Sequence, residues 1–167
     1  MTPLPFALGG RDLIAWRLDE GRHGKTWDSG EGAYRFGGRW NTPGVRAVYS
    51  SIDPATAILE VAVHKGFDAL DIVAQVVTAV LINETAEVRV IRPEEVANPG
   101  WLEAGIPSAG QQAFGNDLLA KHGFVVLPSV VSRRSWNLIF VAERVAGNYR
   151  MLSQERFVLD TRLNPAR

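Results

Sequence analysis

The stretch around which the chain is organised is residues 37–60, GGRWNTPGVRAVYSSIDPATAILE. Two glycines, which permit sharp bends and close approach of a ligand to the backbone, lead directly into Arg39 and Trp40. Residues 41–44 predict a turn, because proline pre-sets φ and the following glycine tolerates a positive φ. The apolar run 46–50 predicts a strand that carries Tyr49. Few purely structural segments need all of these features together.

A helix follows this strand. Asp53 and Pro54 form a helix start, since the aspartate oxygen accepts from unpaired amides and proline loses nothing at the first helical position. Apolar residues then recur on one side at helical spacing, which predicts a helix over residues 54–65. Glu60 falls near the middle of this helix, close to the end of the strand that bears Tyr49. We expect the carboxylate to face either a cleft or solvent.

Taken singly, these charged residues have an ordinary interpretation. An arginine in a glycine-rich loop and a glutamate on a helix are usually solvated surface groups. The hypothesis of a functional site depends on the combination of Arg39, Tyr49 and Glu60 in one continuous segment.

Composition narrows the class of protein. The chain has 167 residues, 46% of them hydrophobic, which predicts a single globular domain over residues 1–167. Eighteen basic residues balance eighteen acidic ones, so we expect no broad nucleic-acid or membrane-binding surface. Cysteine is absent and there are three histidines, so metal chemistry is not expected. Neither a signal-like N-terminus nor a run of about twenty apolar residues is present, which predicts a cytoplasmic protein.

The remaining elements favour the α+β class, because strands outnumber helices without regular alternation. Residues 19–36 are polar and glycine-rich and predict a long functional loop that covers a ligand. Residues 71–82 and 87–91 predict adjacent strands joined by an Asn-Glu-Thr turn. Ser108 predicts the start of a helix that ends near His122. Further strands are expected at 13–18, 124–127, 136–142 and 149–152, the last after a Gly147-Asn148 hairpin turn.

The run GGRWNTPG, followed by VYSS and then by Glu60 in the next helix, resembles the RES domain. This family is named for an arginine, a glutamate and a serine, and is best known as the toxin half of bacterial type II toxin–antitoxin pairs. Pro128-Ser129 and Asn137 match the later motif of the family, and Trp16-Arg17 matches an upstream one. The resemblance covers residues 14–141. The tail departs from it, because the Asn-Pro-His ending of many members is missing.

The resemblance implies a fold like that of ADP-ribosyltransferases, a split mixed β core with flanking helices around an NAD cleft. It also implies NAD as the substrate. Cleavage of the ribose–nicotinamide bond passes through an oxocarbenium-like transition state, which a carboxylate against the ribose stabilises. Glu60 is the candidate for that role.

The other matched residues then have expected roles. Arg39, with Arg17, is expected to grip the diphosphate, because the planar guanidinium suits bidentate contacts. Tyr49 is expected to stack on the nicotinamide, Ser129 to donate to the cofactor or the attacking group, and Asn137 to contact NAD. The structural alternatives are a core tyrosine, a turn serine and a strand-edge asparagine.

Two outcomes stay open at this point. Attack on the ribose by water or phosphate would deplete NAD, whereas attack by a protein side chain would ADP-ribosylate a specific target. A catalytically inactive binding domain is a third possibility, and the retained Arg39, Tyr49 and Glu60 argue against it. The resemblance further implies a cognate antitoxin with a helix-turn-helix DNA-binding part. We expect this partner to block the NAD cleft with an inserted segment.

Overall fold

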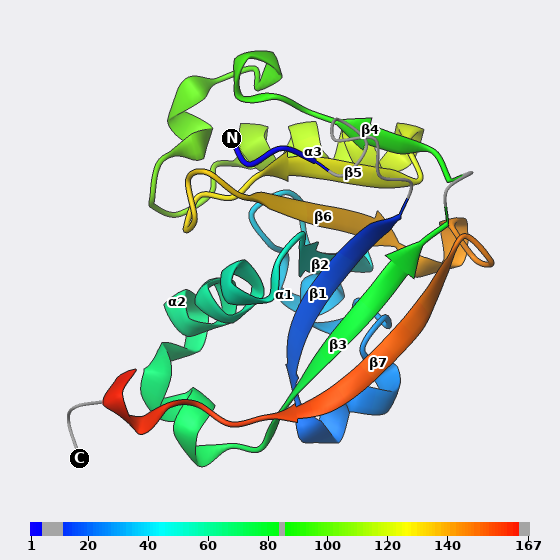
Figure 1. Ribbon diagram of the computed structural model, residues 1–167. Coiled ribbons are helices and arrows are strands. Elements are labelled where there is room, and N and C mark those ends of the chain that lie inside the picture. The colour runs from blue at the N-terminus through cyan, green and yellow to red at the C-terminus, as the bar shows by residue number, and fades with distance from the viewer. Residues whose placement is uncertain (5–11, 84–85, 164–167) are drawn as a thin grey trace.

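A mixed seven-stranded sheet forms the centre of the computed structural model, which describes residues 1–4, 12–83 and 86–163 (Figure 1). The strand order is β4-β5-β6-β2-β1-β3-β7, and only the β4–β5 pair is parallel within this described part. The strands are β1 (Leu13–Glu20), β2 (Ala47–Ser51), β3 (Gln75–Ile82), β4 (Val88–Val90), β5 (Phe124–Pro128), β6 (Trp136–Val141) and β7 (Tyr149–Phe157). The α-helices are α1 (Glu31–Phe36), α2 (Pro54–Ile72) and α3 (Ala109–Lys121).

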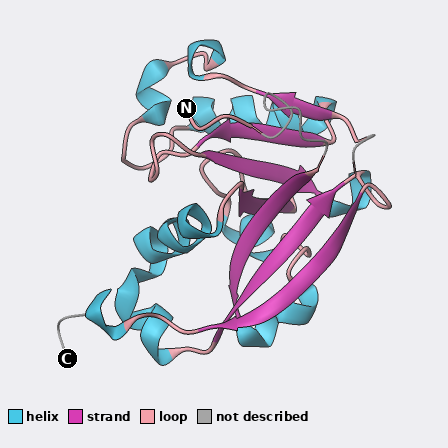
Figure 2. Ribbon diagram, in the orientation of Figure 1, coloured by secondary structure: helices cyan, strands magenta, loops and turns pink. Residues whose placement is uncertain are grey.

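Five short 3-10 helices of the described residues lie in the connections between the strands and α-helices or after the last strand. Their bounds are η2 (Gly21–Thr26), η3 (Pro93–Glu95), η4 (Pro99–Leu102), η5 (Ala142–Arg144) and η6 (Thr161–Leu163). In Figure 2 strand β7 lies along one edge of the molecule, as its place at the end of the strand order requires.

The sheet is divided where β1 meets β2. Among the described residues these two strands are paired at one position, Trp16 opposite Ser51, whereas β1 and β3 pair along their whole length. We call β4, β5, β6 and β2 the β2 half, and β1, β3 and β7 the β1 half. In Figure 1 the strands of the β1 half cross those of β5 and β6 at a steep angle. The junction of the two halves is named the seam.

Each half is covered by its own helix. Helix α3 packs on the β2 half, where Trp40, Leu118 and Ile139 belong to one buried cluster. Helix α2 packs on the β1 half through a cluster that includes Leu18 and Leu70, and it also contacts β2. Helix α2 therefore spans the seam.

Several predicted elements are confirmed. Strand β1 includes residues 13–18, and α2 starts at Pro54 with the Asp53 carboxylate accepting from Thr56 N at 2.7 Å. The predicted end of that helix coincides with Gly66, whose φ of 79° breaks the helical path before the chain resumes it to Ile72. Ser108 caps α3 as expected. The α+β class is confirmed.

Three expectations are wrong. The strands predicted at 71–82 and 87–91 are not adjacent, because β3 lies between β1 and β7, while β4 pairs with β5. Residues 84–85 of the expected turn lie outside the described part. Residues 19–36 are not one long loop, since they contain η2 and α1. Gly147 does turn the chain, with a φ of 84°, but β7 pairs with β3 instead of forming a hairpin with β6.

Candidate functional site

Glu60 is held by two side chains from the β2 half. Its Oε1 accepts from Ser129 Oγ at 2.8 Å and from Asn137 Nδ2 at 2.6 Å. Ser129 and Asn137 are buried, whereas Glu60 is half-buried. Both contacts use the same oxygen, which leaves Oε2 without a hydrogen bond from the residues that the structure describes. The carboxylate is thus fixed on one side and available on the other.

The start of α2 is tied to the loop that carries Ser129. Ser135 Oγ donates to Asp53 Oδ2 at 2.5 Å, and Ser135 O accepts from the Ser129 amide at 3.0 Å. Burial raises the pKa of Asp53, but the hydrogen bonds from Ser135 and Thr56 more than offset it, so the pKa lies below its usual value. The ionised carboxylate therefore caps the helix and positions the loop at the same time.

Asn137 contacts Glu60 from strand β6, which lies next to β2. It lies on β6 directly opposite Ser51 of β2, and Ser51 Oγ donates to Asn137 Oδ1 at 2.8 Å. The sequence predicts Asp53 as a helix cap, but it marks none of Ser51, Asp53 and Ser135 as part of the site. Ser51 belongs to the VYSS run and Asp53 to the Asp-Pro helix start, but neither pattern reveals a contact with the residues around Glu60.

Tyr49 lies two residues before Ser51, on the same face of β2. Its hydroxyl accepts from Trp40 N at 3.0 Å and donates to Asn41 Oδ1 at 2.7 Å. Burial raises the pKa of Tyr49 far above its usual value, while the charges of Arg39 and Glu60 act on it in opposite directions. The phenol thus stays protonated. A Cβ at Gly38 would lie 2.6 Å from the Tyr49 hydroxyl oxygen, which explains the glycine there.

Arg39 is directed at a loop of main-chain carbonyls. Its Nη2 donates to Gly105 O at 3.0 Å, and its Nη1 donates to Trp101 O and Glu103 O at 3.4 Å each. We call residues 101–105 the carbonyl loop. The acceptors are neutral and their bonds are mostly long, so they leave the positive charge of Arg39 unmatched by an anion among the described residues.

Arg17 has different partners. Its Nε and Nη2 donate to the two carboxylate oxygens of Asp19 at 2.8 and 2.7 Å, and its Nη1 donates to Tyr49 O at 2.7 Å. The residue therefore crosses the seam and supports the backbone of β2. A diphosphate would have to compete with these bonds, and the expected role of Arg17 in binding it stays a prediction.

The structure thus arranges the predicted residues in two groups, which strand β2 connects through Tyr49 and Ser51. Glu60, Ser129 and Asn137 touch directly, Tyr49 is linked to Arg39 through the loop that follows Gly38, and Arg17 supports Tyr49. His64, one turn after Glu60, is exposed.

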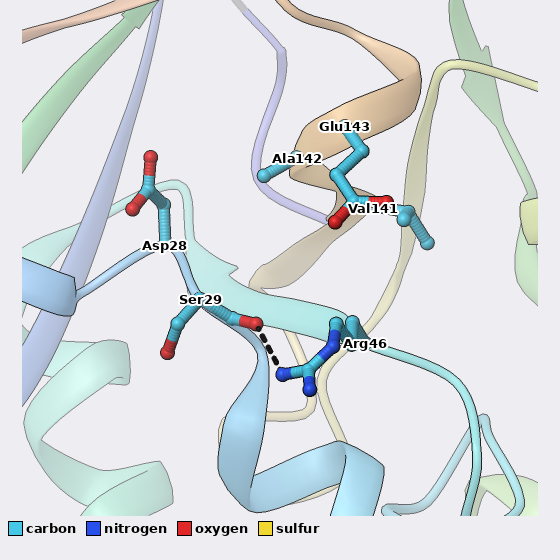
Figure 3. Close-up of a pocket in the computed structure, with 6 residues that line it drawn as sticks. All are labelled: Asp28, Ser29, Arg46, Val141, Ala142 and Glu143. Atoms are coloured by element: carbon cyan, nitrogen blue, oxygen red, sulfur yellow. Dashed lines mark hydrogen bonds between the residues drawn. The ribbon is translucent and has the colours of Figure 1, made fainter.

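A separate cavity of about 210 Å³ is lined by none of these residues. Figure 3 shows the side chains that line it. The cavity is bounded by Asp28, Ser29, Arg46, Val141, Ala142 and Glu143.

Residues 1–4, 12–83 and 86–163 contain no group of three or more His, Cys, Asp or Glu side chains arranged to hold a metal ion. None of the helices described is long and apolar enough to cross a membrane.

Two relatives of known name are similar to this chain in sequence. Over 117 residues, 66% of this chain and 70% of the relative, the sequence is 33% identical to the Prs ADP-ribosylating toxin of a Sphingobium species. It is 41% identical over 58 residues to Toxin Res of Photorhabdus laumondii, a match that spans 35% of this chain and only 37% of that protein.

The fold resembles a solved structure, the MbcT–MbcA toxin–antitoxin complex of M. tuberculosis. The TM-score is 0.72 at 21% identity, over 88% of this chain and 85% of the other. The family model of the RES domain matches residues 14–160. The protein accordingly belongs to the RES domain family.

Proposed function

We propose that this protein is the toxin of a bacterial type II toxin–antitoxin pair and acts by cleaving the ribose–nicotinamide bond of NAD. The observation that carries the proposal is the fixed carboxylate of Glu60, with Oε1 held by Ser129 and Asn137 and Oε2 unoccupied by the described residues. A preorganised negative charge is what an oxocarbenium-like transition state requires. The toxin and ADP-ribosylating names of the relatives support the same class of activity.

The residues around Glu60 suit NAD chemically. Arg39 holds only neutral carbonyls among its described partners, and phosphate oxygens are stronger acceptors for a guanidinium. We infer that the diphosphate takes over Arg39 from the carbonyl loop. The half-buried ring of Tyr49, with its hydroxyl fixed by Trp40 and Asn41, offers an aromatic surface for the nicotinamide.

Nicotinamide release tests the proposal directly. Purified protein incubated with NAD should release nicotinamide, and the rate should fall about 10²–10³-fold in Glu60→Gln, which keeps the shape but removes the charge. Circular dichroism and thermal unfolding establish that the variant is folded. Absence of release by the wild-type protein, with or without phosphate and candidate acceptor proteins, would exclude NAD cleavage and leave a binding domain.

The acceptor of the ADP-ribose separates two forms of this activity. The ADP-ribosylating name of the Sphingobium relative favours transfer to a protein. In that case labelled NAD should leave label on a protein target. If water or phosphate is the acceptor, free ADP-ribose or its phosphorylated form should accumulate instead, without labelled protein.

We also propose a neutralising antitoxin, with a helix-turn-helix DNA-binding part and a segment that enters the site. The solved neighbour is a toxin–antitoxin complex, which supports a partner of this kind. A carboxylate on the inserted segment would pair with Arg39, whose charge is otherwise met by carbonyls. Expression of the chain alone should arrest growth and co-expression of the antitoxin should restore it. A purified complex that still binds and cleaves NAD would show that the partner acts elsewhere.

A further inference from the structure

A short chain of buried hydrogen bonds lies behind Glu60 and begins at Ser51. Ser51 Oγ donates to Asn137 Oδ1 at 2.8 Å, and Asn137 Nδ2 donates to Glu60 Oε1 at 2.6 Å. Ser51 and Asn137 are 2% and 8% exposed, so solvent does not readily replace either bond. These hydrogen bonds connect β2, β6 and α2.

The direction of these bonds follows from the chemistry of the groups. An ionised carboxylate only accepts, so the Asn137 amide must present its NH₂ end to Glu60. The carbonyl end then faces Ser51, where the hydroxyl is the donor. Without that hydroxyl, Oδ1 of Asn137 would be buried and would lose its hydrogen bond from Ser51, which carries a large desolvation cost. The orientation of the amide would then be set by its bond to Glu60 alone, instead of by bonds at both of its ends.

We propose that Ser51 is a positioning residue for Glu60. It fixes the orientation of the Asn137 amide, and the amide with Ser129 fixes Oε1 of Glu60, so that Oε2 points to the reacting ribose. The inference rests on the proposed cleavage of NAD, because it assigns Ser51 a part in placing the carboxylate for that reaction.

The neighbouring serine provides a matched control. Ser50 lies on the same strand, is 5% exposed and donates to Leu138 O at 2.8 Å, the same distance as the Ser51 bond. Successive strand residues face opposite sides of the sheet, so Ser50 points away from Asn137. The acceptor of the Ser50 hydroxyl is a backbone carbonyl, which cannot rotate as a side-chain amide can. Removing the Ser50 hydroxyl therefore deletes an equally buried bond without disturbing the chain to Glu60.

Steady-state kinetics of nicotinamide release test the role. Ser51→Ala should lower kcat about tenfold, a typical effect of losing a residue that orients a catalytic group, with little change in KM for NAD. Ser51→Thr, which retains the hydroxyl, should recover most of the loss, and Ser50→Ala should stay close to wild type. Wild-type turnover by Ser51→Ala, equal losses for the two alanine variants, or a threonine variant as slow as Ser51→Ala would each overturn the proposal.

A measurement without turnover separates this inference from the proposed function. In ¹⁵N-labelled protein, the side-chain NH₂ signals of Asn137 are assigned by their loss in Asn137→Asp. These signals should shift or broaden in Ser51→Ala and stay in place in Ser50→Ala. If they move while wild type releases no nicotinamide, the positioning stands and the proposed function fails. If wild type is active and the signals are unchanged in Ser51→Ala, the positioning alone is wrong.

Discussion

The charges of Glu60 and Arg39 shift the pKa of Tyr49 in opposite directions. The protein also holds the two side chains in different ways. Glu60 accepts two short bonds, at 2.6 and 2.8 Å, from side chains buried in the sheet. Arg39 donates to three carbonyls of an exposed loop, two of them at 3.4 Å. A group whose charge stabilises a transition state gains from being fixed beforehand, whereas a group that captures a ligand needs partners it can exchange. The difference suggests that the site has a rigid end and an adaptable end.

The largest expected effect comes from moving the rigid end. Glu60→Asp keeps the charge but shortens the side chain by one methylene, which draws the carboxylate away from Ser129 and Asn137. We expect kcat for nicotinamide release to fall about 100-fold, because a displacement of about 1 Å has that effect in preorganised sites. Asp68→Asn, which changes an exposed acid on the same helix, should have no effect. Turnover of Glu60→Asp within about threefold of wild type would show that the carboxylate position is not critical.

The next largest effect concerns the adaptable end. Arg39→Lys should raise KM for NAD roughly tenfold, nearly as much as Arg39→Ala, because an ammonium cannot reproduce the bidentate fork. The value of kcat should change less than KM, since Arg39 is assigned to binding. Arg35→Lys, at an exposed arginine of α1 paired with Glu31, is the matched control. A lysine variant with normal KM would assign Arg39 to holding the carbonyl loop alone.

The way in which Asp53 ties the rigid end together predicts a dependence of stability on pH. Its pKa is lowered from 3.8 in the folded protein, because hydrogen bonds from Ser135 and Thr56 outweigh burial. The stability that it contributes is therefore present above pH 3.8 and is lost as pH falls through the lower folded value. Asp53→Ala should cost about 1 kcal/mol at neutral pH, as the loss of a helix cap does.

Urea unfolding between pH 3 and 7 measures this effect, and the difference between wild type and Asp53→Ala should narrow toward the acidic end. Asp117→Asn, an exposed acid of α3 paired with Lys121, is the comparison for a carboxylate outside the site. A constant difference across the range would mean that the charge of Asp53 is not what ties helix and loop together.

The smallest effect is expected at the outer attachment of the carbonyl loop. Glu103 pairs with Arg133, and both side chains are more than half exposed. Exposed ion pairs typically contribute less than about 1 kcal/mol, so Arg133→Ala should barely change the midpoint of urea unfolding. Hydrogen exchange of residues 101–105 should rise only slightly, and clearly more in Arg39→Ala. Equal exchange in the two variants would remove Arg39 as the main attachment of the loop.

Local sequence signals predicted the parts of this molecule that local physics decides. The Asp53-Pro54 start of α2, the Ser108 cap of α3 and the run of β1 follow from capping and apolar patterns that act within a few residues. The order of the strands does not follow from local signals. Strand β3 pairs with β1 and β7, and these pairings join residues far apart in the sequence. A turn signal between β3 and β4 therefore gave the wrong pairing.

The candidate site divides in the same way. Glu60, Ser129 and Asn137 are proposed through the resemblance to the RES domain, and the structure places the three side chains in contact. Ser51 and Ser135 were missed, because a serine in a strand or a loop carries no signal until its partner is placed beside it. The carbonyls that Arg39 contacts are backbone atoms, which residue types do not reveal.

The seam between the two halves of the sheet has a consequence for ligand discovery. Among the described residues, β1 and β2 share one ladder pair, and Arg17 of the β1 half also donates to the Tyr49 carbonyl of the β2 half. A molecule that contacts residues of both halves would hold the two halves together. Because it would bind only the folded protein, it would raise the unfolding free energy by about 2.7 kcal/mol at a concentration of a hundred times its Kd. A thermal-shift screen of nucleotides would therefore find ligands of this site without any turnover, even with Glu60 replaced by glutamine.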